Sequence, residues 1–197
     1  MPVINNIAIR TKEVPDIVGK MSGKLLIMGC GASLWPDLDK YNDHHVGHRM
    51  AINDFMLHYN APLEHGISMH GEAINLFALY RRRVYGRYGH MITHSYYVED
   101  AEVKAKYNIP EYVWETPHTK GSTGLLAVAV GLLMGYEEII LAGMPMDNGG
   151  HYYDPCPFPL MEVHFPYWEF AAKKFFNGQV KSLSGNTREL LGAPAGF

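Results

Sequence analysis

The chain has 197 residues, of which 47% are hydrophobic and 19% charged, which excludes a disordered polypeptide and is typical of a globular protein. Its formal net charge of −3 gives no broad basic field, so binding to duplex nucleic acid is not expected. No apolar run reaches the roughly 18 residues that a membrane-spanning helix needs. Cys30 and Cys156 are expected to be reduced thiols in a cytoplasmic protein that lacks a targeting segment.

The first strong pattern along the chain is an apolar strand that runs into a glycine-rich turn. Residues 1–22 predict only a short edge strand at 3–9 and one or two helical turns at 14–21. Residues 24–28 (KLLIM) then predict a buried strand, followed by the turn GCGASL, which contains Gly29, Cys30, Gly31 and Ser33. Such glycines let the backbone approach a phosphate, and they also serve simply to tighten a strand–helix corner. The turn lacks the third glycine of a dinucleotide fingerprint, so NAD binding is not expected.

Two further strands are predicted at 48–52 and 66–70, and polar residues follow both. Asn53 closes the first and is either a ribose or phosphate contact or the N-cap of a helix at 55–59. His70 closes the second, and a helix at 73–85 follows it. The arginine run 81–83 near the end of that helix predicts a solvated face, with an anionic acceptor or an oligomer contact as the alternative. The histidines at 44, 45 and 48 lack metal-ligand spacing and are predicted to lie in a surface loop.

The rest of the chain predicts more strands and helices in alternation. Strands are expected at 90–97, 112–116, 137–142 and 179–183, and helices at 98–107, 125–133, 162–177 and from 184. Lys120, Ser122 and Thr123 open the 125–133 helix and offer either an anion site or an ordinary helix cap. The loop 144–153 carries Asn148 and Tyr152, each a ligand contact or turn packing. His164 is a candidate general base or a structural histidine.

This alternation predicts a single Rossmann-like α/β domain over residues 1–197, with a mostly parallel sheet flanked by helices. In open sheets of this kind, ligands bind at the carboxyl ends of the strands. The loop after residue 143 and the turn after residue 28 are therefore the first places to expect a site.

Taken together, these segments resemble the bacterial lipo-oligosaccharide sialyltransferases and a related Rossmann-like group. That group includes proteins similar to archaeal 6-hydroxymethylpterin diphosphokinase and many phage and prophage proteins. The resemblance rests on GCGASL, on Asn53 after the second strand, on Ser122-Thr123-Gly124, on GYEEIILAGMPM, on the motif from Asn148 to Tyr152, and on His164 followed by a helix. The chain departs from the family pattern at Cys30, Ala32, His70 and Met146, the last standing where a second phosphate-binding tyrosine is expected.

The resemblance implies a small, metal-independent glycosyltransferase that moves a sugar from a nucleotide-sugar donor to an acceptor hydroxyl. A CMP-sugar is the favoured donor, and no tightly bound cofactor is implied. Gly29, Cys30, Gly31, Ser33, Asn53 and His70 would bind the nucleotide, together with Lys120, Ser122, Thr123 and Asn148. Tyr152 would donate to the departing phosphate oxygen, and His164 would take the proton of the acceptor hydroxyl. The acceptor would be a small molecule or a glycan.

Two alternatives remain open from the sequence. A pyrophosphokinase acting on a pterin-like alcohol would need Mg²⁺, for which Asp54, Glu72, Asp147 and Asp154 are the carboxylates at loop positions. A non-catalytic nucleotide-binding protein, of the kind carried by phages, would keep the fold alone. Assembly into a homo-oligomer is compatible with all three.

Overall fold

The structure is a computed structural model that describes residues 3–4, 7–8, 16–41, 47–96, 112–114, 122–157 and 160–197. Its strands are β1 (Val3–Ile4), β2 (Ile7–Ala8), β3 (Lys24–Met28), β4 (His48–Ile52), β5 (His65–Ser68), β6 (Ile92–Tyr96), β7 (Tyr112–Trp114), β8 (Glu138–Ala142) and β9 (Val180–Ser182). Its helices are α1 (Leu34–Tyr41), α2 (Phe55–His58), α3 (Gly71–Tyr85), the 3₁₀ helix η2 (Gly86–Gly89), α5 (Thr123–Met134), α6 (Leu160–Lys174) and α7 (Gly185–Leu191).

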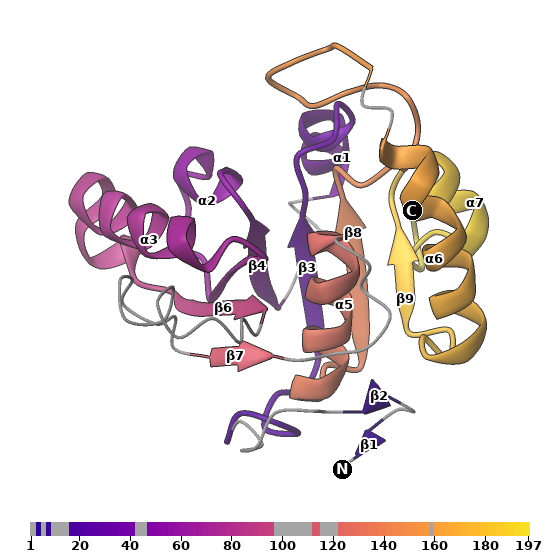
Figure 1. Cartoon of the computed structure of the whole chain (residues 1–197), viewed down its shortest axis with the longest axis horizontal. Coiled ribbons are helices and arrows are strands. Elements are labelled where there is room, and N and C mark those ends of the chain that lie inside the picture. The colour runs from indigo at the N-terminus through magenta and orange to yellow at the C-terminus, as the bar shows by residue number, and fades with distance from the viewer. Residues whose placement is uncertain are drawn as a thin grey trace.

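The main sheet is parallel throughout its described strands, in the order β7-β6-β5-β4-β3-β8-β9. The main sheet begins inside with β3 and extends outwards through β4, β5 and β6 to β7. The chain then returns across the sheet through α5 and places β8 on the other side of β3 (Figure 1). The strand order therefore reverses between β3 and β8. The carboxyl ends of these two neighbouring strands are the topological switch point of the sheet. This α/β Rossmann-like arrangement confirms the predicted fold class.

Two apolar layers hold helices against the two faces of the sheet. Side chains alternate along a strand, so Leu25 and Ile27 of β3 pack on one face and Leu26 and Met28 on the other, all fully buried. The first face is covered by α5 and α6, and the second by α1, α2 and α3. Helix α5 is apolar on all sides, and its residues from Leu125 to Met134 are buried, as the sequence predicts.

A chain of buried hydrogen bonds crosses the sheet beneath α5. The indole N–H of Trp114 donates to His94 Nδ1 (3.1 Å), so His94 Nε2 carries the proton that it donates to His65 Nδ1 (3.1 Å). His65 Nε2 in turn lies 2.8 Å from the Tyr136 hydroxyl, which lies 2.5 Å from His48 Nδ1. This order of donors requires His65 and His94 to be neutral. Burial lowers the pKa of His65 to about 3 and also lowers the pKa of His94.

Several predictions differ from the structure in detail. Strands β1 and β2 pair antiparallel with each other, where the sequence predicts one edge strand at 3–9. His48 is a half-buried member of β4, hydrogen-bonded to Tyr136, and not a loop histidine. The helix predicted at 98–107, His44, His45 and Lys120 lie outside the described residues. Within the described ranges, no helix is both long and apolar enough to cross a membrane.

Candidate functional site

A pocket of about 260 Å³ opens at the switch point, where the carboxyl ends of β3, β4, β5 and β8 face the start of α5. Most of the predicted site residues line it: Gly29, Cys30, Gly31, Asn53, His70, Ser122, Thr123 and His164. It is also lined by residues that the sequence analysis did not place in the site, namely Ile52, Gly124, Gly143, Met144, Met146 and His151. The fold thus brings segments from most of the chain's length into one cavity.

The glycine-rich turn after β3 packs closely against the end of β8. The amides of Gly29 and Gly31 donate to the carbonyls of Ala142 and Gly143, both at 2.8 Å. A Cβ added to Gly31 would lie 2.6 Å from Pro145 Cδ and 2.8 Å from the Gly143 carbonyl oxygen. Gly29 and Gly31 are therefore needed because the ends of β3 and β8 approach each other closely. Their amides are bonded to the end of β8 and are not available to a phosphate, so the predicted phosphate-binding role of this turn does not apply to these amides. The turn contributes its surface to the pocket.

Cys30 and Ser33 are both engaged within the protein. The Cys30 thiol donates to Asp54 Oδ1 (3.3 Å), and burial and the neighbouring Asp54 carboxylate raise its pKa above the ordinary value, which disfavours the thiolate form. Ser33 does not line the pocket, and its hydroxyl donates to Asp37 Oδ2 (3.1 Å). The same buried carboxylate oxygen accepts from the Gly143 amide (2.9 Å) and the Ser184 hydroxyl (2.7 Å). Asp37 thereby connects the loops that follow β3, β8 and β9.

Two pocket residues have left-handed backbone conformations that only glycine adopts without cost. Asn53 has φ +53° and Met146 has φ +51°. Such conformations are enriched at functional sites, where the surrounding structure enforces them. The Ser68 hydroxyl donates to Asn53 Oδ1 (2.9 Å) and accepts from the His70 amide (3.0 Å). Asn53 Oδ1 is thus occupied, and the Nδ2 group remains as the donor that this side chain offers to a ligand. An N-cap role for Asn53 does not apply, because Asp54 precedes α2.

The N-terminus of α5 supplies the positive end of a helix dipole to the pocket. Ser122 is its N-cap, and its hydroxyl accepts from the Leu125 amide (3.3 Å). The amides of Thr123 and Gly124, the first two residues of the helix, have no intrahelical acceptor and are suited to an anion. The capping role and the anion-binding role predicted for this segment are thus compatible.

His164, on α6, is the residue of the described pocket lining that has a buried side-chain nitrogen without a partner. Its Nδ1 atom is buried and has no hydrogen-bond partner among the described residues. Buried polar atoms in folded proteins are almost always paired, so an unpaired one at a cavity indicates a missing partner. Asn148, in contrast, donates to the exposed Glu162 (3.1 Å) and does not line the cavity.

Tyr152 lies outside the pocket, and its neighbour His151 lies inside it. The Tyr152 ring packs edge-on against Trp35 and Phe55, with ring centroids 5.9 and 5.7 Å away. Its hydroxyl is buried without a partner among the described residues, and burial raises its pKa above the ordinary value. His151 forms a β-bridge with Gly31, which turns the loop so that consecutive residues face opposite sides. The sequence contains no signal for this alternation, because the bridge joins residues far apart in the chain.

The carboxylates that a magnesium site would draw on lie outside the pocket lining. Asp54 accepts from Cys30, and Glu72 lies 3.5 Å from His70 Nδ1. Asp147 and Asp154 accept from the amides of Gly149 and Cys156, at 2.9 and 3.0 Å. Among the described residues, no group of three or more His, Cys, Asp or Glu side chains is placed to hold a metal ion.

Comparison with known proteins gives structural neighbours only. No protein-family model matches the chain, and no curated protein sequence matches it. The fold is similar to that of a mammalian sialyltransferase, with a TM-score of 0.48 and 12% identity over 83% of this chain and 69% of that chain. A structure of a mammalian sialyltransferase in complex with Gal-beta-1-3GalNAc-ortho-nitrophenol gives a TM-score of 0.47 and 12% identity, covering 84% and 70%. A likeness at this identity concerns the backbone arrangement.

Proposed function

We propose that this pocket binds a nucleotide sugar and that the protein is a small glycosyltransferase that does not use a metal ion. The observation that carries the proposal is His164, which lines the cavity together with the N-terminus of α5 and whose buried Nδ1 has no hydrogen-bond partner among the described residues. A general base and an anion site at one cavity are the two groups that transfer from a sugar phosphate requires. The position of the cavity at the topological switch point supports a nucleotide as ligand.

In the proposed step, the acceptor hydroxyl attacks the anomeric carbon of the donor sugar. His164 takes the hydroxyl proton as the new carbon–oxygen bond forms, while the bond from the anomeric carbon to the phosphate oxygen breaks and its electron pair leaves with the phosphate. The amides of Thr123 and Gly124 and the Asn53 Nδ2 group would stabilise the charge that develops on the leaving phosphate. The resemblance gives Tyr152 the role of hydrogen-bond donor to the departing phosphate oxygen. Because His151 lines the cavity and Tyr152 does not, we assign this role to His151.

The pyrophosphokinase alternative has less support from the arrangement of carboxylates. It would require Asp54, Glu72, Asp147 or Asp154 to bind Mg²⁺ at the phosphates. None of the four lines the pocket, and each has another partner within the protein. A non-catalytic nucleotide-binding protein would share the cavity, and only turnover distinguishes it from the transferase.

The reaction is tested by donor hydrolysis in the presence of EDTA, using a panel of CMP-, UDP- and GDP-sugars. We expect His164→Ala to lower the rate about 100-fold, the usual contribution of a general base, with nucleotide affinity changed less than about twofold. His90→Ala is the matched control, since His90 is exposed and lies outside the pocket. An unchanged rate in His164→Ala contradicts the mechanism, and the absence of turnover with every donor supports the binding protein.

The leaving-group donor is tested by comparing His151→Ala with Tyr152→Phe. We expect the first to lower the rate about tenfold or more, as does the loss of a donor to developing charge, and the second to leave it nearly unchanged. The opposite pattern would return this role to Tyr152, as the family resemblance implies.

A further inference from the structure

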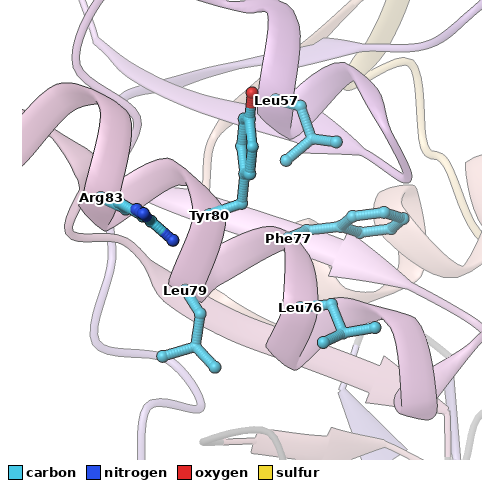
Figure 2. A pocket seen from close by; sticks show the side chains of 6 residues that line it. All are labelled: Leu57, Leu76, Phe77, Leu79, Tyr80 and Arg83. Carbon is cyan, nitrogen blue, oxygen red and sulfur yellow. The ribbon is translucent and has the colours of Figure 1, made fainter.

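Helix α3 presents an apolar face to solvent on the side opposite its packing contacts. Leu76, Leu79 and Tyr80 are 67%, 59% and 55% exposed, whereas Ile74 and Arg81 on the inner side are fully buried. The exposed side chains lie beside Leu57 of α2 and Arg83 along a groove of about 420 Å³. Figure 2 shows Leu76 and Leu79 projecting from α3 while Tyr80 lies towards Leu57. Contiguous apolar surface of this kind marks an interaction site in soluble proteins.

The same face carries opposite charges at its two ends. Glu72, Leu76, Leu79 and Arg83 follow the spacing i, i+4, i+7 and i+11, which places all four on one stripe of the helix. Glu72 is exposed, and its only described ion pair is with His70 at 3.5 Å. Arg83 is exposed and has no carboxylate partner among the described residues. The stripe is therefore acidic at its start, apolar in its middle and basic at its end.

We infer that this stripe is the contact surface of a homodimer in which α3 packs antiparallel against α3 of a second copy. In such a two-fold arrangement, each residue of one helix faces a residue of the other helix, and the two residue numbers of every facing pair add to the same value. A single register sets Leu76 against Leu79 and Glu72 against Arg83, and the symmetry repeats both contacts. Opposed helix dipoles also favour the antiparallel direction. The stripe is thus complementary to itself, because its apolar residues face apolar residues and its acidic end faces a basic end.

The size of the stripe sets the strength of the dimer. A helix of 15 residues is about 22 Å long, so one pair of helices buries less than the roughly 800 Å² per partner of a standard stable interface. The dimer is accordingly weak and depends on protein concentration. It does not depend on the nature of the ligand in the pocket, so its test is independent of the proposed function.

The surface is tested by sedimentation velocity of the full chain over a range of concentrations. We expect the wild type to shift from monomer to dimer as concentration rises, and Leu79→Glu to remain monomeric throughout. Val163→Glu on α6 is the matched control, because Val163 is equally apolar, 55% exposed and far along the chain from the stripe. It should dimerise like the wild type. A wild type that is monomeric at every concentration overturns the inference, as does a dimer that Leu79→Glu leaves intact.

The register is tested by exchanging the two charges. Glu72→Arg and Arg83→Glu should each weaken the dimer about tenfold, because symmetry replaces two attractive pairs with two repulsive ones. The double variant, with both substitutions, should recover most of the lost affinity, since the pairs are then opposite in sign again. Both positions are exposed, so none of the three variants is expected to affect folding, which circular dichroism checks. Weakening in the singles without recovery in the double contradicts the antiparallel register.

Discussion

Neighbouring arginines on α3 illustrate how position decides the role of a residue. The sequence predicts a solvated run at 81–83, and Arg82 and Arg83 are indeed exposed. Arg81 is fully buried, and its guanidinium donates to the carbonyls of Met56 (2.9 Å) in α2, of its C-cap Tyr59 and of Ala61 in the segment that follows. It therefore satisfies the carbonyls that α2 leaves unpaired and holds that helix against α3.

Arg81→Met is expected to lower the free energy of unfolding by about 3 kcal/mol, because two buried carbonyls and one partly buried carbonyl lose their donor. Arg82→Met is the matched control on the same helix, and its effect should stay within about 0.5 kcal/mol. Urea unfolding at neutral pH measures both. Equal effects in the two variants would contradict the structural role of Arg81.

Some residues of the candidate site can be predicted from the sequence, and others cannot. Asn53, His70 and His164 are predicted from polar side chains after buried strands or beside a polar loop, and all three line the pocket. The roles of Gly29 and Gly31 depend on how closely β8 approaches, which is a distance between segments over a hundred residues apart. The direction of a side chain in an irregular loop, as at residues 151 and 152, depends on backbone contacts with the turn after β3 and has no local pattern.

At the scale of elements, the strands were predictable where burial is simple. Both faces of β3 and β8 are covered, so they are continuous apolar runs with clear limits. The predicted strand at 66–70 is displaced from β5 (His65–Ser68), because His65 is polar and yet fully buried by its bonds to His94 and Tyr136. A polar residue made compatible with the core by distant partners cannot be recognised from its own segment.

The histidine chain predicts how stability depends on pH. The pKa of His65 is about 3 in the folded protein and ordinarily about 6.5, so below pH 6.5 the unfolded chain binds a proton that the folded chain does not. The free energy of unfolding should be at its full value above pH 6.5 and fall as the pH decreases towards 3. Between pH 6.5 and 5, His65 alone contributes a loss of about 2 kcal/mol.

Urea unfolding at pH values from 5 to 7.5 measures this loss, in a range above the titration of most carboxylates. His65→Gln should have a shallower dependence over the same range, whereas His90→Gln, at an exposed position, should follow the wild type. A wild type whose stability is flat between pH 7 and 5 would contradict the neutral chain of hydrogen bonds.

At the scale of the whole molecule, the topology creates the site. The return from β7 through α5 to β8 brings the start of α5 over the ends of β3 and β4, and no shorter segment contains the pocket. The alternation of strands and helices in the sequence predicts a mostly parallel sheet, and the ligands of such sheets bind at the carboxyl ends of the strands. We propose that this pocket binds a nucleotide without a metal ion.

The most direct test is a thermal-shift panel of CMP, CDP, UDP, GDP and ATP, each with EDTA and with Mg²⁺. We expect CMP or UDP to raise the Tm in EDTA, by about 5 °C at a concentration of 100 times Kd. Asn53→Ala should reduce this rise, because it removes a donor from the pocket. A rise only with ATP and Mg²⁺ would favour the pyrophosphokinase, and no rise with any nucleotide would contradict the claim.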